Sequence, residues 1–318
     1  MNNQRLDRLA QTIIQRLATG CRNDDLGSAT VAFYDTAWVA LVSKGNGEQK
    51  EWLFPECFRF LLDNQSSDGG WSCHGSCDGQ LLNTLAALLA MKKHSSAGGL
   101  IKHPDQLDLE ARISKATRFL HEHLQAWDIS ESLLVGFEIL VPALLTMLEH
   151  EGVRFDFLGR QQLDILNRTK LSNFEPEVLY STSSSLLHSL EAFVDRIDFD
   201  KVSHHKTFGS MMASPASTAA YLMRASTWDI EAEQYLRKVI HKGAGNGSGG
   251  VPSVFPMPMF EISWVRYSVE CFGWILSDNL VRVSLFFLKR VSPRQYWALR
   301  THTYSLLISM SISSVSTV

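Results

Sequence analysis

Apolar residues recur every three or four positions along most of the chain, a spacing that predicts amphipathic helices. Between residues 4 and 18 they are Leu6, Leu9, Ile13 and Leu17. The same spacing continues in the segments 81–89, 113–124, 137–148, 186–194 and 231–240. Pro142 lies within one of these segments, so we expect that helix to begin near the proline or to bend there. Convincing alternating strand patterns are absent, and the sequence therefore predicts an all-α fold.

Composition and charge exclude several classes of function. The chain has 318 residues, of which 45% are hydrophobic and 20% charged, as is ordinary for a globular protein. Its net charge of -3 gives no basic field that would recruit nucleic acid. Charges and glutamines interrupt the amino-terminal segment, which does not resemble a secretory signal. No apolar run reaches the roughly 18 to 20 residues that a membrane span requires, so we expect a soluble, cytoplasmic protein.

Two local motifs could carry binding chemistry. The segment from Cys73 to Cys77, with His74, could hold a metal, but no second Cys or His pair at finger spacing completes four ligands. Reduced structural thiols are the alternative that we favour for the five cysteines. The glycine-rich stretch 243–250 lacks the Gly-Lys-Ser/Thr ending of a phosphate-binding loop, and we expect a flexible connection between helices.

The carboxy-terminal segment differs from the rest of the chain. No acidic residue occurs after Asp278, and the end is rich in β-prone apolar residues without charges to guard them. Such a segment favours aggregation when it is exposed. We interpret it as an altered or prematurely ended reading frame.

Eight short strings follow one another in a fixed order along residues 33–265. They read FYDTAWVA at 33–40, NQSSDGGW at 64–71, LLNTLA at 81–86, GFEILVPALL at 136–145, LLHSLE at 186–191, SPASTA at 214–219, GGVPSVFP at 249–256 and FEISWV at 260–265. Together they resemble the amino-terminal region of class II diterpene cyclases, namely copalyl diphosphate synthases and fungal bifunctional diterpene synthases of the ent-kaurene synthase type.

The resemblance implies an α/α-barrel architecture. In that family a γ domain is inserted after the first helix of a β domain, and the active site lies between the two. Residues 1–27 would then carry the first helix of the β domain, and residues 28–265 a γ-like α-barrel domain. Residues 266–318 would form a divergent tail in place of the rest of the β domain, which would be incomplete.

The same resemblance implies a reaction. A class II cyclase protonates geranylgeranyl diphosphate and cyclises it to a copalyl-type diphosphate in diterpenoid biosynthesis, an isomerisation. The acid is the central Asp of a D-x-D-D motif, which this chain lacks, as it lacks the D-D-x-x-D of class I sites. We therefore expect a truncated cyclase that is inactive by itself. The alternative is a non-catalytic helical remnant, or a module that associates with a separate chain through an exposed γ-domain face.

The resemblance also transfers roles to single residues. His188 occupies the position of the family histidine that removes the last proton or positions the water for it, and an imidazole suits that task because its pKa lies near neutrality. The alternative is a hydrogen-bonded core histidine. Ser253 stands where plant enzymes of the copalyl type have an Asn that pairs with this histidine. A serine still binds water, but with one hydroxyl in place of an amide.

Three further residues are candidates for contacts with substrate and metal. Asp128 and Glu131 fall where family members carry an acidic motif, and carboxylates suit Mg²⁺, the implied cofactor. The alternative is a solvated acidic pair at a helix start. Trp264 is a candidate for the wall of the substrate cavity, where an aromatic face steadies a cation, with simple core packing as the alternative.

Two of the strings predict structure rather than chemistry. In the string at 64–71, which resembles the QW motif, we expect the Gln65 amide to tie off a helix end and the Trp71 indole to pack over the connection. In the string at 33–40, Asp35 or Thr36 is expected to cap a helix and the aromatic residues to enter the core.

Overall fold

The computed structural model describes residue 12 and the ranges 30–45, 51–72, 77–96, 106–132 and 134–257. The chain divides into two compact units, Thr30–Ser253 and Met1–Ala29 with Val254–Val318. The first unit contains nearly all described residues. The predicted helix at 4–18, apart from Thr12, and the predicted tail 266–318 lie outside the described residues. The domain boundaries expected from the sequence therefore stay predictions.

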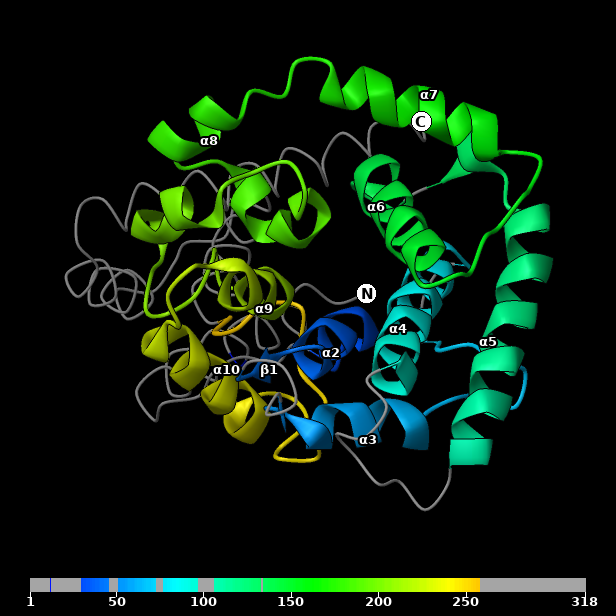
Figure 1. The fold of residues 1–318 in the computed structure, drawn as a ribbon, viewed down its shortest axis with the longest axis horizontal. Coiled ribbons are helices and arrows are strands. Elements are labelled where there is room, and N and C mark those ends of the chain that lie inside the picture. The colour runs from blue at the N-terminus through cyan, green and yellow to red at the C-terminus, as the bar shows by residue number, and fades with distance from the viewer. Residues whose placement is uncertain are drawn as a thin grey trace. The chain divides into compact units, whose positions relative to one another are not determined.

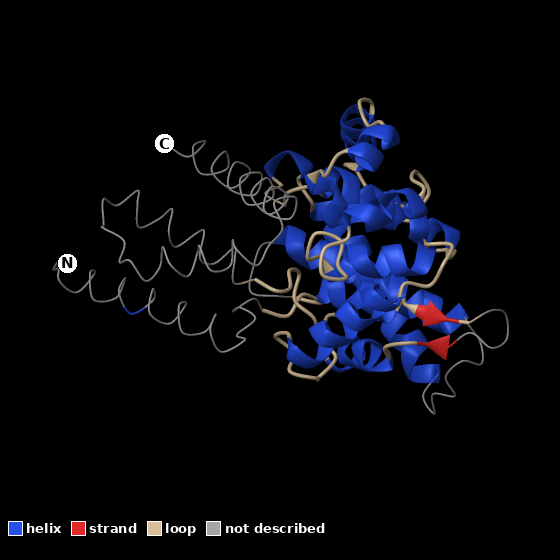
Figure 2. Ribbon diagram, turned by 90° about the vertical axis from the view of Figure 1, so that its left-hand side faces the viewer, coloured by secondary structure: helices blue, strands red, loops and turns tan. Residues whose placement is uncertain are grey.

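Helices dominate the described residues, and only two short strands accompany them (Figure 2). The α-helices are α2 (Phe33–Ala40), α3 (Pro55–Asp63), α4 (Cys77–Ser96), α5 (Gln106–Ala126), α6 (Phe137–His150), α7 (Arg160–Leu171), α8 (Pro176–Ser181), α9 (Pro215–Arg224) and α10 (Ile230–Lys242). The 3₁₀ helices are η2 (Ile129–Glu131), η3 (Ser185–Phe193) and η4 (Phe199–His205), and β1 (Ser43–Lys44) pairs antiparallel with β2 (Glu51–Trp52). Among the described helices, none combines the length and the apolarity needed to cross a bilayer.

The helices of the first unit, Thr30–Ser253, form two concentric layers. The inner helices contact one another in a closed ring in the order α2, α4, α6, η3, α9 and back to α2. Outside it, α3 packs on α2, α5 on α4, α7 on α6 and α10 on α9, as Figure 1 shows. This is an α/α barrel, and the predicted fold class is confirmed.

The sequence explains which helices are inside. Helix α4 is buried at every position from Leu81 to Met91, as expected for a helix that is apolar or small on all sides. Helix α7 carries polar residues on most of its surface and buries only Leu163, so it lies in the outer layer. A helix that is buried on all sides thus belongs to the inner layer, and a helix that is buried on one face belongs to the outer layer.

The inner helices run parallel to one another. Near the carboxy-terminal ends, Nε2 of His94 in α4 lies 2.9 Å from the carbonyl oxygen of Ala40, the last residue of α2. At the opposite end, the amide of Ala216 in the first turn of α9 donates to Oδ1 of Asp35 in the first turn of α2, at 3.3 Å. We call this second end the N-terminal end of the ring.

Pro142 does not begin its helix. Helix α6 starts at Phe137, and Pro142 lies inside it. A proline has no amide hydrogen to donate to the carbonyl four residues earlier, which here is that of Glu138. Nδ2 of Asn167, in α7, donates to this carbonyl oxygen at 2.7 Å. The missing bond within α6 is thereby replaced by one that ties α6 to α7.

The string at 64–71 makes one of the two contacts that were expected of it, because Trp71 bonds near the end of α3 but Gln65 does not bond to a helix end. Nε2 of Gln65 donates to the carbonyl oxygens of Gly69 and Arg112, at 3.0 and 3.1 Å. Nε1 of Trp71, which is fully buried, donates to the carbonyl oxygen of Leu61 near the end of α3 at 2.9 Å. The motif therefore closes helix α3 and attaches the connection after it to α5.

The glycine-rich stretch 243–250 forms a turn that contacts the end of α10 and the start of α3. Its backbone closes on the end of α10, because the amides of Gly243 and Gly247 donate to the carbonyls of Val239 and Ile240. Gly249 has a φ of +99°, and a Cβ at this position would overlap the carbonyl oxygen of Glu56 at the start of α3. Only a glycine permits both this backbone conformation and this close approach.

Candidate active site at the N-terminal end of the ring

A buried carboxyl joins three inner elements of the barrel. Glu191, in η3, is 2% exposed. Its Oε1 accepts a hydrogen bond of 2.9 Å from the phenol of Tyr34 in α2, and its Oε2 accepts one of 2.8 Å from the hydroxyl of Ser217 in α9. Both carboxyl oxygens are thus bonded, as a carboxyl without contact to water requires.

A second buried carboxyl lies beside the first. Asp35 is 4% exposed and accepts the amide of Ala216 in the first turn of α9. Thr36 bonds in two directions, because its hydroxyl donates to the carbonyl of Ala32 and accepts the amide of Val251. The prediction that Asp35 or Thr36 caps its own helix is therefore wrong, because both lie inside α2, which has no side-chain cap. The N-cap of α9 is Ser214, and Asp35 accepts one further amide of its first turn.

Burial shifts the protonation of both carboxyls in the same direction. Burial raises the pKa of Glu191 to about 7. Burial, with the neighbouring charge of Glu191, raises the pKa of Asp35 well above its ordinary value. The phenol of Tyr34 also has a raised pKa, because it is buried and faces Glu191. At neutral pH the two carboxyls, Glu191 and Asp35, therefore carry less negative charge than two ionised carboxylates would.

His188 lies in the same 3₁₀ helix, three residues before Glu191, and is half-buried. Its Nδ1 is 3.1 Å from the carbonyl oxygen of Met212. A carbonyl only accepts hydrogen bonds, so Nδ1 carries the hydrogen and Nε2 is the basic nitrogen of the neutral ring. Burial lowers the pKa of His188, and the bond to Met212 raises it in part. A neutral imidazole at pH 7 is the form that accepts a proton.

The segment that supplies this carbonyl consists of two tight turns. Phe208 and Gly209 have φ values of 51° and 80°, and Met212 and Ala213 have 49° and 57°. The backbone bridges Thr207 to Ser210 and Met211 to Ser214 close the two turns. Non-glycine residues rarely adopt positive φ, so the conformation around Met212 is held by its surroundings.

Ser253 is exposed and follows Pro252, which forms a backbone bridge with Val31 just before α2. Because α2 starts at the N-terminal end of the ring, Ser253 lies at that end. Trp264 lies outside the described residues. The roles assigned to His188, Ser253 and Trp264 from the sequence remain predictions.

Asp128 and Glu131, the acidic pair, differ in their surroundings. Asp128 caps η2, and its Oδ1 accepts the amide and the hydroxyl of Ser130 at 3.0 and 2.6 Å. These bonds hold the pKa of Asp128 below its ordinary value. Glu131 is exposed at the end of η2. Lys93 near the end of α4 pairs with Glu151 just after α6, so α6 runs parallel to α4 and the acidic pair before α6 lies at the N-terminal end.

The described residues contain no group of three or more His, Cys, Asp or Glu side chains that could hold a metal ion. Asp128 and Glu131 together offer two carboxylates as metal ligands. Magnesium in proteins is often held in this way, with water and substrate phosphates as the other ligands. The pair therefore fits Mg²⁺ only together with a bound diphosphate.

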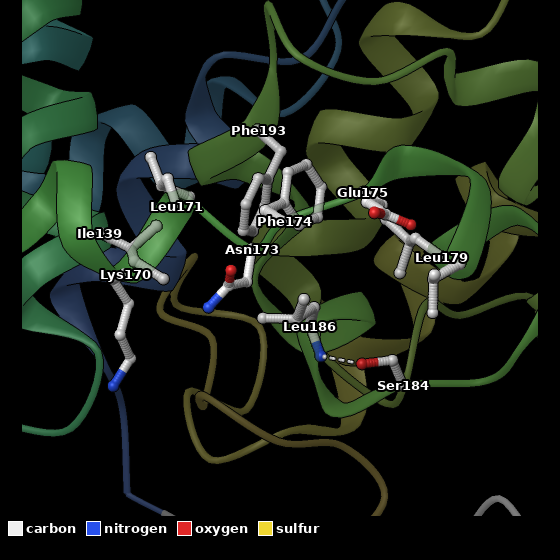
Figure 3. A pocket seen from close by; sticks show the side chains of 11 residues that line it. Ile139, Lys170, Leu171, Asn173, Phe174, Glu175, Leu179, Ser184, Leu186 and Phe193 are labelled. Carbon is white, nitrogen blue, oxygen red and sulfur yellow. Dashed lines mark hydrogen bonds between the residues drawn. The ribbon is translucent and has the colours of Figure 1, made fainter.

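Several cavities lie elsewhere in the unit. One of about 230 Å³, shown in Figure 3, lies between α6, α7, α8 and η3, with Ile139, Phe174, Leu186 and Phe193 in its wall. It is smaller than the roughly 300–1,000 Å³ of typical ligand pockets. Another, of about 650 Å³, lies at the carboxy-terminal ends of the inner helices and includes Trp38 and Arg224. Neither of these two cavities includes His188.

Solved structures share this fold. The ent-copalyl diphosphate synthase of Arabidopsis thaliana matches with a TM-score of 0.66 and 26% identity, over 88% of this chain and 39% of the other. The abietadiene synthase of Abies grandis matches with a TM-score of 0.65 and 26% identity, over 89% of this chain and 35% of the other. The fold is thus that of the α-helical terpene cyclases.

Curated fungal proteins are more similar in sequence. The pimaradiene synthase of Emericella nidulans is 49% identical over 257 residues, 81% of this chain and 26% of the relative. The copalyl diphosphate synthase of Talaromyces verruculosus is 48% identical over 282 residues, 87% of this chain and 29% of the relative. No protein-family model matches the chain. The chain belongs to the class II diterpene cyclases and corresponds to an amino-terminal portion of them, spanning about a quarter of the length of these relatives.

Sequence reasoning missed two residues of this site. Glu191 and Ser217 lie inside two of the matched strings, LLHSLE and SPASTA, but nothing in their spacing shows that they meet. Ser217 and Glu191 are 26 positions apart and belong to different helices. The signal that could have singled them out is that polar residues stand where the helical pattern demands burial.

Proposed function

We propose that this chain supplies the γ-domain part of a class II diterpene cyclase that converts geranylgeranyl diphosphate to a copalyl-type diphosphate. The observation that carries the proposal is the contact of 3.1 Å between Nδ1 of His188 and the carbonyl oxygen of Met212. This nitrogen donates to the carbonyl, and burial lowers the pKa of His188. A neutral ring with Nε2 as the basic nitrogen accepts the proton, directly or through water, that leaves the last carbocation.

The proton that starts the reaction has to come from elsewhere. The sequence D-x-D-D does not occur in the 318 residues. In the proposed reaction a carboxylic acid of a further segment or chain protonates the terminal alkene. The chain alone is therefore proposed to bind but not to cyclise the substrate.

Three further contacts complete the proposal. Asp128 and Glu131 would hold Mg²⁺ at the diphosphate, since both carboxylates lie at the same end of the ring as His188. Ser253 would bind the water that the plant enzymes bind with Asn, and Trp264 would line the cavity. A soluble, cytoplasmic location remains part of this proposal.

The first experiment uses the full chain. Purified protein is incubated with geranylgeranyl diphosphate and Mg²⁺, the products are dephosphorylated, and copalol is measured. We expect none, because the proton donor is absent. Copalol from the chain alone would overturn this part of the proposal.

The second experiment supplies the missing acid. Residues 33–253 replace the matching region of the Talaromyces verruculosus copalyl diphosphate synthase, to which the chain is 48% identical. We expect this chimera to form a copalyl-type product, and His188→Ala to lower its turnover about 100-fold, within the range of general-base catalysis. His241→Ala, which changes an exposed histidine in the last turn of α10, is the matched control. Undiminished turnover in the His188→Ala chimera would refute the assigned role.

A further inference from the structure

His188 is fixed by the structure from two directions. Its own segment, η3, is interrupted directly after it, where Ser189 has the non-helical angles φ -135° and ψ 38°. Its ring is held from the other side by the carbonyl of Met212, in the second of the two tight turns. The position of the imidazole therefore depends on what fixes the interrupted helix and what fixes that turn.

Ser217 fixes the interrupted helix. Because Ser189 breaks the helical geometry, the following amide needs an acceptor outside the helix. The hydroxyl of Ser217 accepts the amide of Leu190 at 2.7 Å and donates to Oε2 of Glu191 at 2.8 Å. Ser217 is fully buried, so neither bond has water as a substitute.

Thr218 fixes the turn. Its hydroxyl accepts the amide of Met211 at 3.0 Å and donates to the carbonyl of Ser214 at 2.7 Å. Thr218 is also fully buried. These bonds hold the two ends of the turn whose second residue, Met212, presents its carbonyl to His188.

We propose that Ser217 and Thr218, adjacent on α9, are positioning residues that fix the orientation and the tautomer of His188. Ser217 acts through η3, and Thr218 acts through the turn at Met212. One turn of one helix thereby holds both the histidine and its hydrogen-bond acceptor. Because both the ring and the Met212 carbonyl are fixed, the hydrogen stays on Nδ1 and the basic lone pair stays on Nε2.

The inference deepens the proposed function and rests on His188 acting as the base, but its test does not need turnover. The chain is labelled with ¹⁵N-histidine, and long-range ¹H–¹⁵N spectra are recorded above pH 8, where the ring of His188 is neutral because burial lowers its pKa. The resonances of His188 are those lost in His188→Ala. In the unaltered chain we expect the Nδ1–H form to predominate.

Two variants test the pair. Thr218→Val keeps the shape of the side chain and removes its hydrogen bonds, and Ser217→Ala removes the acceptor of the Leu190 amide. We expect the Nδ1–H form to lose its majority in each variant, because the ring no longer faces a fixed carbonyl. Thr146→Val is a control at an exposed position, since the Thr146 hydroxyl also donates to a carbonyl four residues earlier, that of Pro142 in α6.

The outcomes separate the two hypotheses. If either variant keeps its helical circular dichroism and retains the Nδ1–H majority, the positioning role of that residue is refuted. If Thr146→Val shifts the tautomer as much as Thr218→Val, the effect is general loosening and the proposal is also refuted. If the tautomers shift as expected while His188→Ala leaves the chimera active, the proposed function fails and the positioning inference stands.

Discussion

The phenol of Tyr34 donates a 2.9 Å hydrogen bond to the carboxyl of Glu191, which lies 157 positions further along the chain. The bond joins α2 to η3 across the interior of the barrel, where both residues are buried. With Ser217 on the other carboxyl oxygen, Glu191 connects three of the five elements of the inner ring. The same buried carboxyl makes the stability of the barrel depend on pH.

The pKa of Glu191 is raised to about 7 in the folded chain, compared with an ordinary value of 4.5. A raised pKa in the folded state gives stability that is fully present below pH 4.5 and is lost as the pH rises through 7. Glu191→Gln imitates the protonated side chain and removes this loss. We expect the variant to exceed the parent in free energy of unfolding by up to about 3 kcal/mol at pH 8, at about 1.4 kcal/mol per pKa unit.

Urea denaturation at pH 5 and pH 8 measures this difference. At pH 5 we expect the Glu191→Gln variant and the parent to differ little. Glu177→Gln, at an exposed position in α8, controls for the general effect of removing a negative charge. A Glu191→Gln variant that is less stable than the parent at pH 8 would contradict the assignment of a protonated carboxyl.

Gly249 has to remain a glycine for two reasons, its φ of +99° and the proximity of the Glu56 carbonyl. At Gly247 only the positive φ, +83°, favours glycine, because nothing lies within 4 Å of a Cβ placed there. Both alanine variants should therefore lose stability, Gly247→Ala by about 1 kcal/mol. Gly249→Ala should lose a further 1–3 kcal/mol or so, as overpacking does. Equal midpoints of thermal unfolding would show that the contact with Glu56 is unimportant.

The amide of Asn167 replaces the hydrogen bond that Pro142 cannot give, so Asn167→Ala should leave the Glu138 carbonyl without a donor. We expect a loss of about 1–2 kcal/mol in the free energy of unfolding. Asn64→Ala is the control, because Nδ2 of Asn64 also donates to a carbonyl, that of Phe60, but at an exposed site. There water replaces the lost donor, and we expect a change of less than about 0.5 kcal/mol. Similar losses in the two variants, measured by chemical denaturation, would speak against this role of Asn167.

Ala213 has a φ of 57°, which a glycine adopts without strain. The relief of strain in Ala213→Gly, about 1–2 kcal/mol, exceeds the added entropy of the unfolded chain, and we expect a net gain of up to about 1 kcal/mol. Ala225→Gly should instead destabilise the chain, because Ala225 follows α9 with an ordinary φ of -63°. Thermal unfolding of both variants distinguishes the two positions, and a loss at Ala213 would mean that its methyl group has a packing role.

Part of the site could be predicted from the sequence because its residues lie in contiguous strings. The string LLHSLE points to His188, and NQSSDGGW predicts that Trp71 packs at the connection after α3, where its acceptor Leu61 lies only ten positions away. The hydrogen bond from the first turn of α9 to Asp35 could not be predicted from the sequence. Asp35 satisfies an amide of α9, 181 positions away, and periodicity contains no information about such a pairing.

The segment 186–194 shows the limit of a periodic pattern. Its apolar spacing predicts an α-helix, but the chain forms the 3₁₀ helix η3 with a break at Ser189. The break is stable because the hydroxyl of Ser217 takes over the amide of Leu190. Since that acceptor comes from another helix, local propensity alone favours the wrong geometry.

The amino-acid sequence by itself determined that the described part of the chain is mainly helical, several of its helical segments, and to which family its strings correspond. Those properties follow from the spacing of apolar residues and from short contiguous motifs. Only the tertiary structure decided that the helices close into a ring, that Glu191 is buried between Tyr34 and Ser217, and that Nδ1 of His188 lies at the carbonyl of Met212. Each of these findings depends on burial and on residues that are distant in the chain. The burial and the distant contacts arise only when the barrel closes.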